Sequence, residues 1–220
     1  AQADFLYRLG ELKTGSLYDL DGALSAFRKA IERYPQHVAA RAAVEADPKA
    51  GLLTMLTGMG SLSYGELAGE RMKLGLMLND PEEEHDCFSD NTHNSHFYDG
   101  LGIRNVYLGS YARTDGSVVS GPSLSELVAA ADPAVDTQLK AELDASVMAL
   151  QAVKDAGDAG KTYDTLIAPG NAEGEALIMG AVNALVTQTA SIDRAVSALG
   201  LSKVDFEGSD SLDNPNAVFQ

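Results

Sequence analysis

With 220 residues, of which 45% are hydrophobic, the chain is long enough to bury a core in one large or two small domains. Its 32 acidic and 16 basic residues give a formal net charge of -16, which excludes nucleic acid as a partner and favours small cations. No apolar run approaches the roughly 20 residues that span a bilayer, so no membrane span is expected.

Residues 1–46 have the pattern of a helical hairpin. Four positions match the spacing of the second helix of a tetratricopeptide repeat: Ala23, Phe27, Ala30 and Pro35. One such repeat cannot bury its own apolar face and must pack on another surface. Two interpretations stay open, a tetratricopeptide-like repeat over about residues 7–35 and a plain amphipathic hairpin. In both, the segment could have been joined to residues 47–220 from elsewhere.

The next stretch predicts two helices in succession. Asp47-Pro48 is a good N-cap and first helical position for a helix to about residue 57, where two glycines are expected to interrupt it. Ser63 and Glu66 have the spacing of a capping box, which would restart a helix that ends at Leu78. Asp80-Pro81 then predicts a short, capped acidic turn.

Residues 91–131 predict two further helices with a small hairpin between them. Asp90 is expected to cap the first helix, which continues to about residue 106. The composition then changes to Gly, Ser, Thr and Asp, and a turn signal at 114–117 separates two short runs, which favours a β-hairpin near residues 110–122. Ser123 and Glu126 form another capping box, which opens the second helix.

Two long amphipathic helices follow. Asp132-Pro133 opens one that ends near residue 156, and the other covers about residues 172–199. After Gly200 the chain is polar and acidic, and we expect residues 200–220 to form an extended tail on the surface. Long helices with short, capped connections predict an all-α, up-and-down helical bundle with at most one small β-hairpin.

Three of the four histidines lie between residues 65 and 109 and are candidate metal ligands. His93 and His96 are three residues apart, so both imidazoles can share one face of a helix. His85 would join them only if the chain folds back. The alternative is structural, because the acids that precede His85 can also complement a helix dipole. The acids around Cys87 disfavour its thiolate, so Cys87 is not expected to act as a nucleophile. No catalytic residue is assigned.

The charged pair Glu70-Arg71 lies in an otherwise apolar helix and is the second candidate. A guanidinium inside a bundle must be paired, and Glu70 points about 100° away around the helix. We therefore expect Arg71 to reach the 89–93 segment, and Asp90 in particular. Glu70, Arg71, Asp90, Asn91 and His93 would then form one half of a ligand site, or would instead only hold the bundle together.

Three runs in this order resemble the imelysin-like proteins, and most closely their iron-regulated protein A branch: GMGSLSYGELAGERM at 58–72, DPEEEHDCFSDNTH at 80–93 and GIRNVYLG at 102–109. The resemblance covers about residues 47–220. The family signature Gly-x-His-x-x-Glu belongs to the N-terminal half of the full-length proteins and is not in this sequence. The resemblance implies two helical bundles, of which this chain supplies the second, with the candidate residues at the cleft beside the upstream half.

The function that the resemblance implies is binding of a metal ion or a small metal-bearing ligand, with a divalent metal or iron as the candidate cofactor. The protein would act in iron acquisition in the periplasm or at the outer membrane; the sequence shows no signal peptide, as a mature protein would not. Two alternatives stay open. One is a metallopeptidase of the imelysin type, whose strongest candidate ligand and base are missing, and the other is a structural or interaction module.

Overall fold

The computed structural model describes residues 47–219 of the chain. The predicted hairpin at residues 1–46, together with the tetratricopeptide-like match, lies outside the described residues. The chain divides into two compact units, residues 1–55 and 56–220. The bundle belongs to the second unit, and the division falls inside the helix α4 (Pro48–Ser61).

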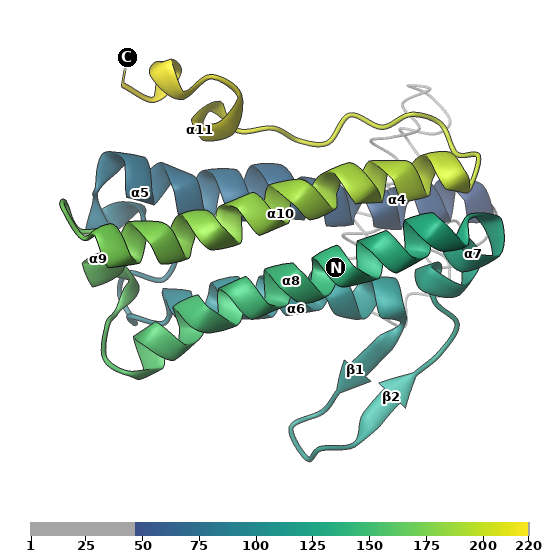
Figure 1. The fold of residues 1–220 in the computed structure, drawn as a ribbon, viewed down its shortest axis with the longest axis horizontal. Coiled ribbons are helices and arrows are strands. Elements are labelled where there is room, and N and C mark those ends of the chain that lie inside the picture. Colours follow the sequence, from purple (N-terminus) through teal and green to yellow (C-terminus); the bar gives the residue numbers. More distant parts are fainter. Residues whose placement is uncertain (1–46, 220) are drawn as a thin grey trace, which may run out of the picture. The chain divides into compact units, whose positions relative to one another are not determined.

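Four helical rods build the bundle (Figure 1). The first rod continues α4 through a π-helical segment, η1 (Leu62–Lys73), into α5 (Leu74–Leu78). The others are α6 (Thr92–Leu108), α8 (Pro133–Asp158) and α10 (Ala172–Ala198). Successive rods run in opposite directions, which confirms the predicted all-α, up-and-down bundle.

Short elements connect the rods. The strands β1 (Ser110–Ala112) and β2 (Val118–Ser120) pair antiparallel with Tyr111 opposite Val119, so the predicted small hairpin is confirmed. The remaining connections and the C-terminal part contain two 3-10 helices and three short α-helices: η2 (Pro81–Glu83), α7 (Leu124–Ala131), α9 (Tyr163–Leu166), α11 (Asp210–Asp213) and η3 (Pro215–Phe219).

Most predicted helix starts are confirmed because their signals are local. The capping box at Ser123 and Glu126 is complete, with both of its hydrogen bonds at 3.0 Å. The Asp132 carboxylate accepts from two backbone N–H groups of the first turn of α8. The Asp80 carboxylate caps η2 in the same way. Each cap satisfies N–H groups that have no partner inside their own helix.

The predicted interruption at residues 58–63 is wrong. The rod stays helical through Gly58 and Gly60, and no capping box forms at Ser63. Instead the buried Ser63 hydroxyl donates to the Leu185 carbonyl at 3.0 Å and accepts from the Gln188 amide at 2.8 Å. Because these partners lie on α10, a tertiary contact uses the oxygen that a cap would have needed.

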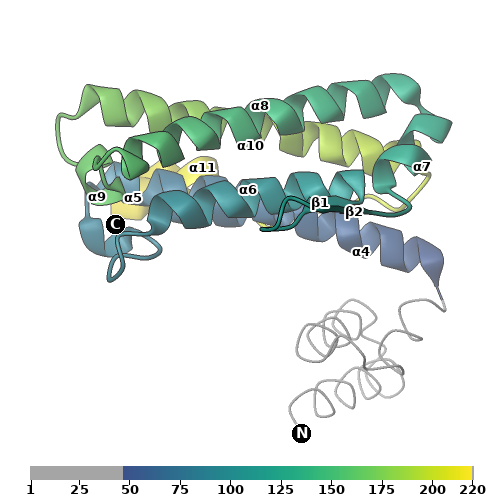
Figure 2. The same cartoon turned by 90° about the horizontal axis from the view of Figure 1, so that it is seen from below.

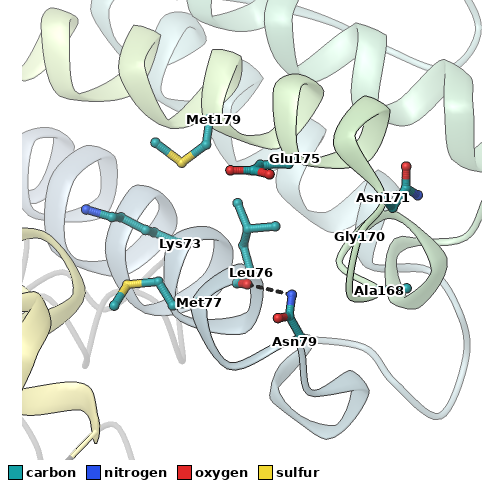
Figure 3. A pocket seen from close by; sticks show the side chains of 9 residues that line it. All are labelled: Lys73, Leu76, Met77, Asn79, Ala168, Gly170, Asn171, Glu175 and Met179. Atoms are coloured by element: carbon teal, nitrogen blue, oxygen red, sulfur yellow. Dashed lines mark hydrogen bonds between the residues drawn. The ribbon is translucent and has the colours of Figure 1, made fainter.

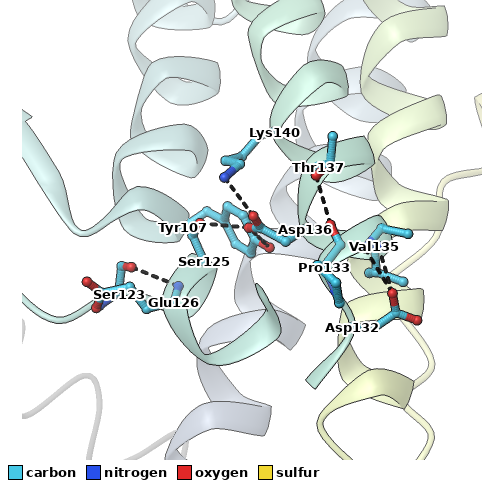
Figure 4. Close-up of polar contacts among 11 residues, drawn as sticks. Tyr107, Ser123, Ser125, Glu126, Asp132, Pro133, Val135, Asp136, Thr137 and Lys140 are labelled. Carbon is cyan, nitrogen blue, oxygen red and sulfur yellow. Dashed lines mark hydrogen bonds and ion pairs between the residues drawn. The ribbon is translucent and has the colours of Figure 1, made fainter. Parts of the chain in front are cut away.

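A buried carboxylate ties three elements of the bundle together (Figure 4). Asp136 on α8 is only 3% exposed and accepts from the Tyr107 hydroxyl at 3.0 Å and the Ser125 hydroxyl at 2.7 Å. Lys140 forms an ion pair with it at 2.6 Å. Burial opposes ionisation, but these three donors outweigh it and lower the pKa of Asp136. The Asp136 carboxylate has three donors, so the hydrogen-bonding capacity of this network is satisfied and the network stabilises the fold.

The apolar core lies between the four rods, with α9 closing one end of it. It includes Leu67 and Met72 of η1, Leu150 of α8 and Ile178 of α10. Residues 201–208 form neither helix nor strand, the short helices α11 and η3 follow them, and Ser209 and Ser211 are buried rather than on the surface. No helix within residues 47–219 is long and apolar enough to cross a membrane.

Candidate functional site

The candidate site lies at the end of the bundle where α5 ends and α6 begins. Figure 2 shows α5, α9 and the first turns of α6 gathered at this end. The first three turns of α6 carry His93, His96 and Asp99, while Arg71 projects from the last part of η1. The connecting segment 79–91 contributes Glu84, which is buried although its neighbours are exposed. Polar side chains from three elements therefore meet beside the core.

Arg71 is paired, but not with the predicted partner. Its Nη1 lies 2.6 Å from Asp99 Oδ2, and its Nε lies 3.2 Å from Glu66 Oε2. The prediction of an Arg71–Asp90 pair is wrong because Arg71 lies seven residues before the end of α5, beside the third turn of α6. Asp90 is exposed in the connecting segment with φ at 50°. Arg71 thus joins η1 to α6 through a half-buried ion pair.

His96 is the most unusual side chain of this region. It is fully buried, and neither ring nitrogen has a hydrogen-bond partner among residues 47–219. Its ring meets the ring of Tyr163 edge-on, with centroids 4.8 Å apart. Burial lowers the pKa of His96 to about 3, and electrostatic interaction with His85, Arg71 and His93 lowers it further. The imidazole is therefore neutral at physiological pH.

Two more buried polar groups lie in the same neighbourhood. Glu84 is 5% exposed, and the Tyr163 ring is fully buried. One Glu84 oxygen and the Tyr163 hydroxyl have no partner within the described residues. Burial raises the pKa of both groups; the charge of Glu84 raises that of Tyr163 further, whereas a hydrogen bond with Thr92 opposes the rise at Glu84. Buried polar atoms are rarely left unpaired, and His96, Glu84 and Tyr163 share this feature within the described residues.

His93 lies close by; its Nδ1 is buried without a partner among residues 47–219, and its Nε2 is engaged elsewhere. Its Nε2 lies 3.0 Å from the Asn94 amide and 3.4 Å from the Asp158 carboxylate at the end of α8. Its ring leaves no room for a side chain at Gly157, where an added Cβ would lie 2.3 Å away. No three His, Cys, Asp or Glu side chains within residues 47–219 gather closely enough to hold a metal ion. Metal binding by His85, His93 and His96 stays a prediction that requires further ligands.

The other predicted site residues lie on the surface. Glu70 is exposed on η1. Asn91, and not Asp90, occupies the N-cap position of α6, and its side chain accepts from the Asn94 amide at 3.0 Å. Asp99 and Tyr163 were not predicted, and neither was the burial of Glu84. Asp99 could have been found, because it lies three residues after His96 on the same face of the helix.

A pocket of about 270 Å³ lies apart from the histidines, between α5 and the start of α10 (Figure 3). Lys73 and Glu175 bring opposite charges to it, and Met77 and Met179 supply apolar walls. Asn79 fixes its edge by donating to the Ile167 carbonyl at 2.7 Å. No pattern in the sequence indicates this pocket, because its walls come from segments almost 100 residues apart.

Comparison with known proteins agrees with the sequence resemblance. The model of the imelysin family (peptidase M75) matches residues 16–192, so the match begins upstream of residue 47, where the resemblance was placed. No curated protein matches the chain. With most of its length matched by that model, the chain belongs to the imelysin family.

Proposed function

We propose that this imelysin-family chain contributes one half of a binding site for a metal cation, with iron as the cargo. The observation that carries the proposal is the buried, neutral and unpaired imidazole of His96. Neutral imidazole is the commonest metal ligand in proteins. Leaving its nitrogens unpaired in the core is costly unless a partner binds there in another state of the protein.

Apart from His85, Arg71 and His93, which act on the His96 pKa, the wider charge balance of this end of the bundle favours a cation over an anion. The carboxyl groups of Glu66, Glu84 and Asp99 stand against the single guanidinium of Arg71. The whole chain adds a net charge of -16, which raises the local concentration of cations. Asp99 is 28% exposed and His85 is exposed, so both can contact a cation at the surface near the buried imidazole.

The described residues do not complete a metal site by themselves, because no three candidate ligands among them lie close enough together. The remaining ligands would come from an upstream imelysin half that carries Gly-x-His-x-x-Glu, across the cleft that the family resemblance implies. A role in iron acquisition in the periplasm or at the outer membrane follows from the same resemblance and is part of the proposal. The described residues give no specific reason to prefer peptidase activity.

Paramagnetic broadening by Mn²⁺ tests this proposal, because it detects weak binding at identified side chains. Isotope-labelled chain is titrated with Mn²⁺, and the signals of His85, His96 and Asp99 should broaden first. The same titration of His96→Phe should show much weaker broadening at the other two residues, whereas the matched surface variant Glu70→Gln should behave as the wild type. Broadening confined to the acidic C-terminal segment, or unchanged in His96→Phe, would contradict the proposal.

A further inference from the structure

The π-helical geometry of η1 is unusual in its length. Twelve consecutive residues, Leu62–Lys73, follow it, whereas π-helix is mostly found as single turns inside α-helices. The bond from the Leu74 N–H to the Gly69 carbonyl, five residues back, is one example of the register. Because an α-helix is the more favourable backbone arrangement, contacts outside the η1 backbone must stabilise this one.

The C-terminal strap, which we define as residues 206–213, supplies such contacts. It runs back along the end of α4 and along η1 (Figure 1, yellow). Ser211, which is buried, donates its hydroxyl to the Gly69 carbonyl, so it contacts the backbone of the π-helix itself. Three hydrogen bonds of 2.6–3.0 Å join the strap to the rod: Glu207 N–H to Ser61 Oγ, Ser211 Oγ–H to Gly69 O, and Tyr64 O–H to Asp213 Oδ1.

Glycines on the rod let the strap approach this closely. A Cβ added at Gly65 would lie 2.4 Å from the Glu207 carbonyl oxygen, and one at Gly69 would lie 2.3 Å from Ser209 Cβ. Both distances are far below van der Waals contact, so any side chain at these positions would expel the strap. Gly60, Gly65 and Gly69 follow one another at intervals of five and four residues, and all three meet strap residues.

The π-helical register of η1 also determines the position of the Arg71 side chain. Glu66 and Arg71 are five residues apart, and their side chains meet at 3.2 Å. In an α-helix, positions five apart point about 140° away from each other, so this ion pair could not form. In a π-helix, bonds from residue i to i+5 bring such positions onto one face. The pair with Glu66 helps to orient the guanidinium toward Asp99.

We infer that docking of the C-terminal strap holds η1 in its π-helical register and thereby positions Arg71 beside Asp99. When the strap leaves, Ser211 no longer holds the Gly69 carbonyl, η1 relaxes toward α-helical bonding, and Glu66 separates from Arg71. Where it concerns ligand binding, this coupling rests on the proposed function. Binding at the Arg71–His96 face and docking of the strap then favour each other, since coupling between two sites is reciprocal.

Alanine at a strap-facing glycine separates the strap from the rod with a minimal change. Gly65→Ala should release the strap, and its amides should exchange hydrogen about tenfold faster or more, as expected for a segment that opens locally. The Arg71 Nε–H signal in NMR spectra should lose its slow exchange in the same variant. Gly58→Ala is the matched control on the same rod, because an added Cβ there meets no atom of the described residues within 4 Å. Both readouts should be unchanged in it.

A second route covers the case in which Gly65→Ala does not fold. The chain truncated after residue 201 should lose the slow exchange of Arg71 Nε–H, and a synthetic peptide of residues 202–220 should restore it in trans. The same peptide with Ser211→Ala should restore it less. An unchanged Arg71 signal in a variant whose strap is released would overturn the inference, and so would a strap that stays docked in Gly65→Ala. No readout involves a metal ion, so failure of the proposed metal binding would be seen separately.

Discussion

Replacing Arg71 with methionine should destabilise the bundle by about 2 kcal/mol at neutral pH, mainly because Asp99 is left without its partner. The Arg71 and Asp99 side chains are 23% and 28% exposed and meet at 2.6 Å. Exposed ion pairs contribute about 0–1 kcal/mol, and removal of one partner of a fully buried pair costs about 3–5 kcal/mol. A half-buried pair lies between these limits.

The double-mutant cycle with Asp99→Asn isolates the pair. Asp99→Asn removes the orphaned carboxylate, so the two substitutions together should cost at least about 1 kcal/mol less than the sum of the single costs. Urea unfolding of the wild type and the three variants gives these free energies. The matched control is Asp90→Asn in the Arg71→Met background, where the costs should add to within about 0.5 kcal/mol. Additivity with Asp99, or coupling with Asp90, would refute the pairing.

The pH dependence of Arg71→Met has a definite sign. Burial already raises the pKa of Asp99 above its usual value, although Arg71 opposes the rise. Without Arg71 the folded-state pKa rises further, so the carboxyl group becomes neutral at a higher pH. The cost of Arg71→Met should therefore shrink as the pH falls through that pKa, because the unpaired charge disappears. A cost that is constant between neutral and mildly acidic pH would contradict this reasoning.

Three further predictions follow from other parts of the bundle. The folded-state pKa of His96 is lowered to about 3, so the free energy of unfolding should fall as the pH drops below about 6.5, by about 2 kcal/mol at about pH 5. Urea unfolding of His96→Phe should lack this part of the pH dependence. Asp136→Ala should cost about 3 kcal/mol, and Asp144→Ala, whose carboxylate is 56% exposed, less than about 1 kcal/mol. The chain should not cleave an unfolded protein; chelator-sensitive cleavage lost in His93→Ala would show peptidase activity.

The sequence predicted most element boundaries because their signals lie within a few residues. The caps at Ser123 and Asp132 each need only a side chain and a backbone N–H up to three residues away. The same type of pattern misled at Ser63, where Glu66 follows at the spacing of a capping box. There the Ser63 hydroxyl donates instead to the Leu185 carbonyl on α10, 122 residues away. The π-helix has no local signal, because its stabilising contacts come from the C-terminal strap.

For the candidate site, the sequence identified the unusual side chains but not their partners. Arg71 and His96 stand out because charged and ionisable groups are rare inside apolar helices. Which carboxylate pairs with Arg71 depends on how far η1 runs beside α6, and that is set by packing rather than by spacing. The return of the chain through α9 brings Tyr163 against His96, and Glu84 of the 79–91 segment is buried near Tyr163; no pattern near either residue indicates this.

The most direct test of the account is the metal content of the protein with and without an upstream imelysin half. The present chain, dialysed against a chelator, should retain no stoichiometric iron or zinc, since the described residues lack three convergent ligands. When the chain is combined with a half that carries Gly-x-His-x-x-Glu, iron should be retained, and His96→Phe should abolish the retention. Stoichiometric metal on the chain alone, or retention by the combined protein that does not depend on His96, would contradict the half-site account.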